Sequence, residues 1–433
     1  MSTGVQPPAD QRRFLFLQGP HGPFFAKLGK MLRAADAQVW RIGFNAGDQA
    51  MWFRGPGYIP FTDTPENWPA FYQDRLDEHQ ITDIVLYGDT RQIHATAVKE
   101  AKARGLRVHI FEEGYLRPYW VTYERDGSNG HSRLMGLGVL EMQKALETVD
   151  MDVPEAPARW GDMRQHMFYG ALYHWYVMLR NRKYKGFRPH RDISVWREFQ
   201  LYFQRLMLAP LLAFDRIAAT MRIKYGGFPY HLVLLQLEHD ASFREHSPFD
   251  TMPQFLETAL RGFAEGAAKH HHLVFKAHPL EDGRVPQRRE IRRIAKELGI
   301  GNRVHYVRGG KLAKLLNHAR SAITVNSTAA QQVLWRGLPL KVFGDAVYAK
   351  PEFVSKQSLP EFFQQPTRPD TRSYRDYRHY LLETSQIAGG FYSAGGRRQI
   401  LRQVVDLMLA DQDPYDALMT GNAPPRQQLH SIQ

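Results

Sequence analysis

The stretch HLVFKAHPLEDGRVPQRREIRRIAKELGIGNRVHYV, residues 272–307, contains the repeating unit that decides the fold. An apolar run at 272–276 is followed by an amphipathic segment at 287–298 and by a second apolar run at 304–307. The two runs have the length of strands, and the segment between them has the periodicity of a helix. Two parallel strands need a crossover of this kind, so the stretch predicts a βαβ unit in a parallel sheet.

The same alternation of short apolar runs and amphipathic segments extends through most of the chain. In the second half we expect further strands at 231–237, 322–325 and 340–343, and further helices near 252–269, 311–319 and 328–336. In the first half we expect strands at 14–17, 39–44, 81–87 and 108–111, with a connecting helix at 92–104. Two such halves predict an α/β protein with two Rossmann-like domains facing a cleft.

Length and composition restrict the class of protein. A chain of 433 residues, 43% of them hydrophobic, can fill two domains, because single cores stop growing at about 250–300 residues. This composition excludes a disordered or fibrous protein. The chain has no cysteine, which excludes disulfides, cysteine-ligated zinc and a cysteine nucleophile. No apolar run approaches the roughly 20 residues of a membrane span, and the amino terminus lacks the apolar core of a signal peptide, so we expect a cytoplasmic protein.

The formal net charge of +13 is concentrated in one segment. Residues 159–224 contain 13 Lys and Arg against four acidic residues, together with aromatic residues at helical spacing such as Tyr169, Tyr173 and Tyr176. Basic aromatic helices suit a membrane surface, where cations meet anionic lipid and rings lie at headgroup depth. The alternative is an ordinary helical segment between two domains, with its aromatic side chains packed inward.

A Pro-rich run at 153–157 marks a domain edge just before this segment. We therefore expect four parts, namely an N-terminal Rossmann-like domain at 1–150, a basic aromatic helical segment at 151–225, a C-terminal Rossmann-like domain at 226–400, and a helix with a polar tail at 401–433.

Ligands of open α/β sheets bind beyond the carboxyl ends of the strands, so the residues that follow each expected strand are the site candidates. In the first half these are Gln18, Gly19, Asn45, Asp48, Asp89, Arg91, Glu112, Glu113 and Arg117. In the second half they are Gln236, Asp240, Lys276, His278, Pro279, Asn326, Ser327 and Thr328.

Several of these side chains fit phosphate chemistry. Ser327 and Thr328 at a helix start can hold a phosphate with hydroxyls and free backbone N–H groups. His278, fixed by Pro279, can donate a proton to a phosphate oxygen as it leaves, and Lys276 can add positive charge.

The remaining candidates fit sugar transfer to a hydroxyl group. Glu112 or Glu113 can act as base or acid toward a hydroxyl, and Asp240 can serve as a nucleophile or as a stabiliser of an oxocarbenium ion. Arg91 and Arg117 can grip an acidic substrate. Each residue also has a structural explanation, because Asn-Ser-Thr commonly caps a helix and adjacent glutamates are commonly a solvated pair. Their joint placement at the strand ends is what indicates a functional site.

The sequence argues against a metal site. The two D-x-D strings, Asp150 with Asp152 and Asp411 with Asp413, fall in an expected linker and near the tail. The run His270–His272 suits a surface turn, because adjacent histidines do not face one metal in regular structure. We therefore predict no metal and no bound cofactor.

The motifs at the strand ends resemble a known family. QGPHGPF, FNAGD, YGDTRQIH and FEEGYLRP, followed by QLEHDAS, KAHP and NSTAA, are similar in type and order to the capsule polysaccharide biosynthesis proteins of the KpsS/LipB type. The resemblance runs from about residue 14 to 350. It implies a two-domain, GT-B-like transferase that moves Kdo, an eight-carbon acidic sugar, from CMP-β-Kdo with retention onto phosphatidylglycerol or lysophosphatidylglycerol.

The resemblance also implies roles and partners. Glu112 or Glu113 and His278 would belong to the active centre, with Ser327 and Thr328 near the CMP phosphate, while the retaining outcome points to Asp240 as nucleophile. The first domain would bind the acceptor and the second CMP-Kdo. The implied location is the inner face of the bacterial inner membrane, beside a poly-Kdo-extending transferase and a capsule export complex, and no nucleic acid is implied.

Two alternatives stay open. The first is a transferase of another CMP-sugar, similar to sialic acid, with a non-lipid acceptor. The second is a non-catalytic scaffold that binds capsule polymer or another polyanion. The carboxylates at the strand ends argue against nucleic acid as that polyanion, because they repel phosphates.

Overall fold

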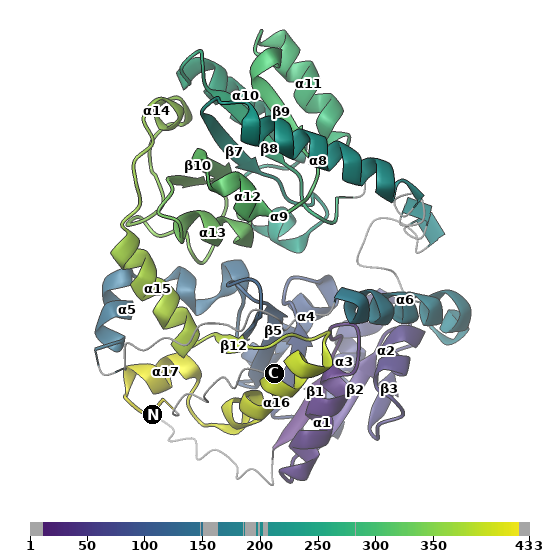
Figure 1. Ribbon diagram of the computed structural model, residues 1–433. Helices are drawn as coiled ribbons and strands as arrows, with labels where there is room; N and C mark the ends of the chain where they lie inside the picture. The colour runs from purple at the N-terminus through teal and green to yellow at the C-terminus, as the bar shows by residue number, and fades with distance from the viewer. Residues whose placement is uncertain are drawn as a thin grey trace. The chain divides into compact units, whose positions relative to one another are not determined.

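A computed structural model shows two α/β units, each built on its own largely parallel sheet (Figure 1). It describes residues 12–147, 149, 163–184, 186, 196–197, 200–201, 207–281 and 283–423. Unit 1 comprises Met1–Arg133, Lys144–Val195 and His379–Gln433, and unit 2 comprises Leu134–Gln143 and Trp196–Arg378. The prediction of an α/β protein with two parallel sheets is therefore confirmed. The cleft between the two domains stays a prediction.

Unit 1 contains a seven-stranded sheet in the order β12-β6-β5-β4-β1-β2-β3. Strands β1 to β5 pair in parallel, whereas β6 is antiparallel to β5 and β12 is antiparallel to β6. The bounds are β1 Arg13–Phe16, β2 Gln38–Gly43, β3 Tyr58–Pro60, β4 Asp83–Tyr87, β5 Arg107–Glu113, β6 Trp120–Arg125 and β12 Gln386–Ala388. The four strands expected in this half are present within a few residues, and β3, β6 and β12 were not expected.

Both faces of this sheet are buried. In β1, Phe14 and Phe16 point into one core beneath α1 and α16, while Leu15 points into a second core beneath α3 and α4. Burial on both faces is typical of parallel strands and leaves their ends as the place for polar side chains. The helices of the unit are α1 Phe24–Ala34, α2 Ala46–Met51, α3 Trp68–Glu78, α4 Gln92–Ala103, α6 Met163–Arg180, α16 Ala394–Leu409 and α17 Pro414–Met419.

The C-terminal part of the chain completes unit 1. The sequence predicts that the second domain extends to residue 400, whereas the chain returns to unit 1 at His379. Strand β12 extends the first sheet by pairing Ile387 with Val121. The Gln386 side chain donates to Thr122 Oγ1 at 3.0 Å and accepts from the Leu116 N–H at 3.3 Å. A three-residue strand at a sheet edge leaves no pattern in the sequence. The sequence therefore does not predict that the chain returns to the first sheet through β12.

Unit 2 contains a five-stranded parallel sheet in the order β11-β10-β7-β8-β9. Its strands are β7 Tyr230–Leu234, β8 His272–Lys276, β9 Val304–Val307, β10 Ala319–Thr324 and β11 Leu340–Val342, which agree with the expected strands. Its helices are α8 Ala209–Tyr225, α9 Ala241–His246, α10 Met252–Gly266, α11 Gln287–Glu297, α12 Leu312–Leu316, α13 Gln331–Leu334 and α14 Leu359–Gln364. The chain changes unit at four points, and two of them lie within α-helices, one in α5 (Val139–Ala145) and one in α15 (Thr371–Glu383).

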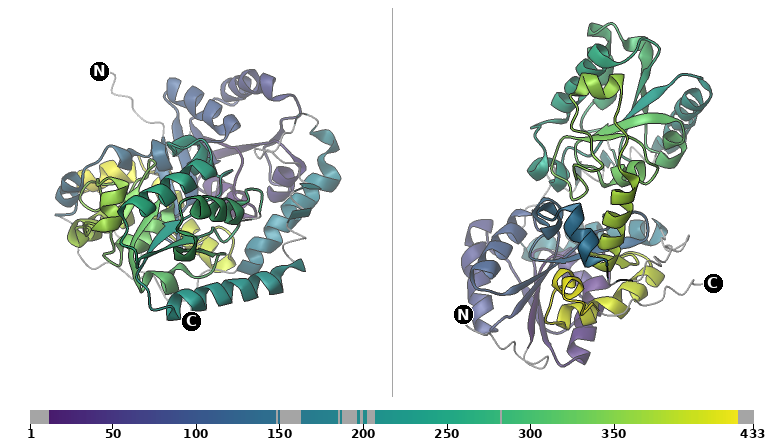
Figure 2. Two further views of the ribbon diagram at one scale, coloured as in Figure 1. Left: turned by 90° about the horizontal axis from the view of Figure 1, so that it is seen from above. Right: turned by 90° about the vertical axis from the view of Figure 1, so that its left-hand side faces the viewer.

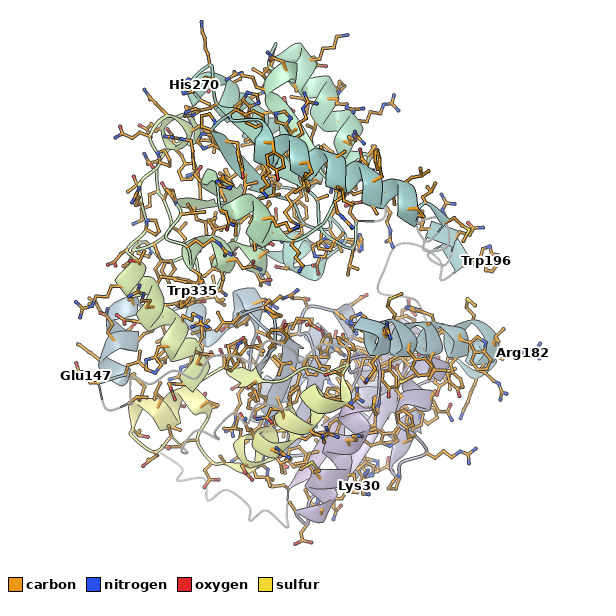
Figure 3. The ribbon with its side chains drawn as sticks, viewed as in Figure 1. Lys30, Glu147, Arg182, Trp196, His270 and Trp335 are labelled. Atoms are coloured by element: carbon orange, nitrogen blue, oxygen red, sulfur yellow. The ribbon has the colours of Figure 1, made fainter. Side chains whose placement is uncertain are left out.

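The basic aromatic segment expected at 151–225 is not one body between two domains. Its first described helix, α6, belongs to unit 1, and its second, α8, belongs to unit 2. Residues 151–162, 185, 187–195, 198–199 and 202–206 of this segment lie outside the described residues, as do the tail residues 424–433. Figure 3 labels Arg182, just after α6, and Trp196, on the approach to α8.

Within the described part of the chain, no helix combines the length and the apolar character needed to cross a membrane.

A buried ion pair connects the first strand of unit 1 to its neighbours. Arg12 donates to both carboxylate oxygens of Asp83, and His109 Nε2 lies 2.8 Å from the same carboxylate. Burial alone raises the pKa of Asp83, but the hydrogen bonds and charges of His109 and Arg12 outweigh it and hold the pKa below its ordinary value. Tyr123 completes the network at 2.8 Å from His109 Nδ1.

We expect Asp83→Asn to destabilise unit 1 by about 3–5 kcal/mol, because it leaves the Arg12 charge buried without its partner. Chemical denaturation followed by circular dichroism measures this change. The matched control is Glu257→Gln, which removes the exposed i,i+4 pair with Arg261 and should change the midpoint little. Equal midpoints for the two variants would contradict the assigned role of Asp83.

Candidate active site

Three of the predicted site residues of unit 1 meet at one tyrosine of α6. Asn45 Nδ2 donates to the Tyr173 hydroxyl at 2.7 Å, and that hydroxyl donates to Asp48 Oδ1 at 3.2 Å. Gln18 Nε2 donates to Asp48 Oδ2 at 3.0 Å. The pKa of Tyr173 is raised by burial and by the Asp48 charge, so its hydroxyl stays protonated.

This cluster holds α6 over the carboxyl ends of β1 and β2. Gln18, Asn45 and Asp48 are all buried, and Asn45 also caps α2 by accepting from the Asp48 N–H at 2.9 Å. A side chain on Gly47 would bring its Cβ within 2.7 Å of the Tyr173 ring, so the close approach of α6 requires glycine there. In this structure the polar groups of these residues serve the docking of a helix. The sequence signal for Tyr173 was its helical spacing in the basic segment.

Glu113, at the end of β5, lies in a setting of two tyrosines and a histidine. The Tyr87 hydroxyl donates to Glu113 Oε1 at 3.1 Å. Tyr392 lies close enough to both Glu113 and Tyr87 for them to shift its pKa, and the centre of its ring lies 3.9 Å from that of His166 on α6. Burial and the Glu113 charge raise the pKa of both tyrosines, which therefore remain hydrogen-bond donors. Burial lowers the pKa of His166, while the Glu113 charge raises it.

Glu112 points to the other face of the sheet. Successive residues of a strand alternate between faces, so Glu112 shares the face of Ile110 rather than that of Phe111. Its Oε1 accepts from the Glu113 backbone N–H at 3.0 Å, and its Oε2 lies beside Gly88. The structure thus separates two glutamates that the sequence left equivalent, and Glu113 is the one whose carboxylate accepts from the Tyr87 hydroxyl. Tyr87, His166 and Tyr392 were missed because they come from three distant segments.

The other predicted residues of unit 1 have mixed environments. Asp89 is buried and accepts from the Ser128 N–H at 3.0 Å and from His131 at 3.2 Å. Arg91 donates to Gln18 Oε1 at 3.3 Å. Arg117 is exposed and donates to the Gly114 carbonyl at 3.2 Å. Gly19 adjoins Phe25, whose ring atom Cδ2 would lie 2.4 Å from an added Cβ.

In unit 2, Gln236 and Asn326 form a mutual pair across β7 and β10. Gln236 Nε2 donates to Asn326 Oδ1 at 2.6 Å, and the Asn326 N–H donates to Gln236 Oε1 at 3.0 Å. Asn326 Nδ2 donates to the carbonyls of Ser242 and His246, at 2.8 and 3.1 Å. Both side chains are buried, so they fix the loops at this edge of the sheet.

Lys276 and Arg308 bring positive charge to the carboxyl edge of the second sheet. Lys276 is buried, and burial lowers the pKa of its amine to about 8. Lys276 pairs in register with Val307, so Arg308 follows the neighbouring strand β9 at the same edge. Arg308 precedes Gly309 and Gly310, which both have positive φ and form a turn. The string Arg-Gly-Gly after an expected strand was the available signal, and sequence reasoning overlooked it.

The remaining predicted residues of unit 2 follow strands of the same sheet. His278 Nδ1 accepts from the Leu280 N–H at 3.1 Å, which leaves the proton of the neutral ring on Nε2. Pro279 follows it and is exposed. Asp240 is exposed at the N-cap of α9, where its side chain forms no capping bond among the described residues. Ser327 Oγ accepts from the Ala329 N–H at 3.3 Å, and Thr328 begins the next turn of helix.

The side chains of the run His270–His272 do not converge on one site. His270 lies at the outer surface in the turn before β8 (Figure 3). His271 Nδ1 lies 3.1 Å from His231 Nε2, and His272 Nδ1 lies 2.7 Å from His305 Nε2. In the described ranges, no three or more His, Asp or Glu side chains group in a way that could hold a metal ion. Asp150 and Asp152 lie outside those ranges.

Residues 82–392 match the family of the capsule polysaccharide biosynthesis proteins. The chain belongs to this family. Its relatives include the capsule polysaccharide export protein KpsS of Escherichia coli, 29% identical over 88% of this chain and 97% of that protein. They also include the capsule polysaccharide modification protein LipB of Neisseria meningitidis serogroup A, 32% identical over 88% of this chain and 91% of that protein.

Solved structures similar to this capsule polysaccharide biosynthesis protein share little sequence with it. The β-Kdo 2,7 transferase KpsC of Thermosulfurimonas dismutans is 12% identical, covers 92% of this chain and 100% of its own, and has a TM-score of 0.42. A glycosyltransferase of Rickettsia africae is 8% identical, with coverage of 95% and 97% and a TM-score of 0.34.

In this family member we expect Tyr173→Phe to loosen α6 from unit 1, because three hydrogen bonds to the buried side chains of Gln18, Asn45 and Asp48 are lost. Hydrogen exchange of the α6 amides should become about fivefold to a hundredfold faster, as follows from a loss of about 1–3 kcal/mol. Tyr176→Phe is the matched control on the same helix and should leave the exchange rates unchanged. Identical exchange in both variants would remove Tyr173 from the docking of α6.

Proposed function

We propose that this protein is a glycosyltransferase that moves Kdo from CMP-β-Kdo, with retention, onto a phosphatidylglycerol-type lipid. The product would start the poly-Kdo linker of a capsular polysaccharide at the inner face of the inner membrane. Membership of the capsule polysaccharide biosynthesis family supports the pathway. The donor, the retention and the lipid acceptor are inferred from the strand-end motifs and their resemblance to the KpsS/LipB type.

One observation carries this proposal. The family match at 82–392 contains both the Glu113 carboxylate with its tyrosine pair in unit 1 and the Lys276, His278 and Arg308 edge in unit 2. The first is an acid–base group suited to a hydroxyl acceptor, and the second is a cationic edge suited to a nucleotide phosphate. A scaffold that only binds a polyanion has no need of the first.

We assign the donor to unit 2. Lys276 and Arg308 would neutralise the CMP phosphate, and Ser327 and Thr328 would donate hydrogen bonds to it. His278, with its proton on Nε2, would protonate or hydrogen-bond the phosphate oxygen when the bond to the sugar breaks. CMP leaves as a monophosphate, so charge stabilisation by these side chains suffices in principle and we propose no metal.

Retention fits two successive displacements. The Asp240 carboxylate would attack the anomeric carbon as the bond from that carbon to the CMP phosphate oxygen breaks, and CMP would leave with the electron pair. The acceptor hydroxyl would then give its proton to Glu113 and attack the same carbon, which releases Asp240 as the carboxylate. Asp240 is exposed and therefore accessible to a sugar.

The reaction is tested by incubating the protein with freshly generated CMP-Kdo and a fluorescent short-chain phosphatidylglycerol, with mass spectrometry of the lipid. We expect one added Kdo. Asp240→Ala and Glu113→Gln should each lower the rate by about a hundredfold or more. Arg117→Gln changes an exposed side chain at the same edge of unit 1 and separates substrate binding from catalysis. It should mainly raise KM.

Other outcomes lead to the alternatives. Release of CMP above the no-enzyme rate, with the lipid intact, would keep the donor and reject the lipid acceptor. Transfer from another CMP-sugar alone would reject Kdo. A protein that neither binds CMP-Kdo nor reacts would be the polyanion scaffold. Association with a poly-Kdo-extending transferase or a capsule export complex is a separate proposal that co-purification from cells tests.

Lys276 should make CMP binding weaker at high pH. Its pKa of about 8 means that the amine loses its charge between pH 7 and 9, whereas the CMP phosphate is already doubly ionised above pH ~6. An anionic ligand favours the protonated amine, so the Kd for CMP should rise about tenfold from pH 7 to pH 9. Lys276→Arg keeps the charge and should flatten the profile. Isothermal titration calorimetry measures both, and a flat wild-type profile would remove Lys276 from the phosphate site.

A further inference from the structure

Helix α8 presents a continuous apolar stripe to the outside of unit 2. Within α8 the stripe is formed by exposed side chains spaced three or four residues apart, so they lie on one side of the helix. Leu211 is 68% exposed and Phe214 is 74% exposed. Its members in α8 are Leu211, Phe214, Ile217, Met221 and Tyr225, and Met207 and Leu208 just before the helix are counted with them, here called the α8 stripe. The left-hand view of Figure 2 shows α8 along the rim of unit 2.

The stripe is not the face by which α8 packs on its own unit. Ile223, only 3% exposed, lies on the opposite side of the helix, which contacts β9 and α12. Asp215, the single acidic residue in the α8 sequence, pairs with Arg288 of α11 at 3.3 Å. A helix at the surface of a globular unit ordinarily turns charged side chains outward. Helix α8 is apolar on both sides, so its outer side is suited to a partner.

A basic cavity adjoins the stripe. It has a volume of about 330 Å³ and lies between α8, α11 and β9. Arg222, Arg288 and Arg292 line it together with His305 and Tyr306, against the single carboxylate of Asp215. Ala218, one turn from both Phe214 and Arg222, lines the cavity at the edge of the stripe. Guanidinium groups of this kind bind phosphate by paired hydrogen bonds.

We propose that the α8 stripe and the Arg222–Arg292 cavity form a docking surface for a bilayer that contains anionic phospholipid. The stripe enters the acyl boundary, and the cavity takes the phosphate of one headgroup. Charge complementarity selects this partner, because α8 carries Arg222 and Lys224 beside the stripe and its only acid is paired. An apolar protein partner would have no use for the arginine cavity.

This surface is separate from the site of the proposed reaction. Gly301, Val304 and His305 place the cavity toward the amino end of β9, whereas Lys276 and Arg308 stand at the carboxyl edge of the sheet. A lipid held in the cavity is therefore a membrane contact and not the sugar acceptor. Vesicle binding needs no sugar transfer, so the two proposals can fail independently.

The test uses the full-length protein and flotation with two kinds of vesicle, one of phosphatidylcholine alone and one in which a third of the lipid is phosphatidylglycerol. The stripe variant carries Leu211→Gln, Phe214→Gln and Met221→Gln, all at exposed positions. We expect its partition coefficient to fall about tenfold or more on both vesicles. The cavity variant carries Arg222→Gln and Arg292→Gln, and we expect a loss of about fivefold per charge on the phosphatidylglycerol vesicles alone.

Each variant has a matched control. Met31→Gln, Leu140→Gln and Met419→Gln remove three exposed apolar side chains elsewhere. Arg289→Gln and Lys296→Gln remove two charges from α11 without touching the cavity lining. Both controls should bind vesicles as the wild type does, and thermal melts of all four variants should match the wild type.

The proposal would be overturned if the stripe and cavity variants bound vesicles as strongly as the wild type. It would also be overturned if the wild type did not bind phosphatidylglycerol vesicles. A dimer in light scattering that the stripe variant dissociates, without vesicle binding, would assign the stripe to a second copy instead. Sugar transfer to a micellar short-chain acceptor should be equal in all variants. An inactive protein that still floats would reject only the proposed chemistry, and an active protein that does not float would reject only this surface.

Discussion

Parallel strand pairing is the constraint on which both units depend. A parallel pair is joined only through a crossover, so the ends of successive strands gather at one edge of each sheet. Both faces of the first sheet are filled, with Phe14 and Phe16 in one core and Leu15 in the other. Polar side chains on those faces need buried partners, as Asp83 and His109 have, and the strand ends collect most of the others.

The polar side chains at these edges divide into two kinds. Some are buried and saturated by neighbours, such as the Gln236 and Asn326 pair or the Asp48 carboxylate that holds Tyr173. Their hydrogen bonds set the geometry of loops and of α6. Others have chemistry to offer a ligand, such as Glu113 beside its tyrosine pair and the buried amine of Lys276.

The two long helices of the basic segment, α6 and α8, belong to different units. In α6 the aromatic side chains divide, because Tyr173 packs inward on Asp48 while Phe168 and Trp175 are exposed. In α8 the exposed side chains are aliphatic as well as aromatic and form a stripe beside a basic cavity. Membrane docking and inward packing are the two alternatives for the whole segment. For α6 the structure supports inward packing in part, because Tyr173 is packed inward. A protein proposed to glycosylate a lipid benefits from a second lipid contact remote from its catalytic residues.

The sequence by itself determined the α/β class, most strands of both sheets and the edge at which candidate residues would collect, because strand length, helical periodicity and the crossover rule are local. Tertiary structure alone decided the rest. Strand β12 joins the first sheet through edge pairing with β6, which leaves no local pattern. Tyr392 and His166 reach Glu113 from distant segments. Glu112 and Glu113 differ because a strand alternates its side chains between two faces, and only packing against each face reveals which carboxylate accepts from the Tyr87 hydroxyl.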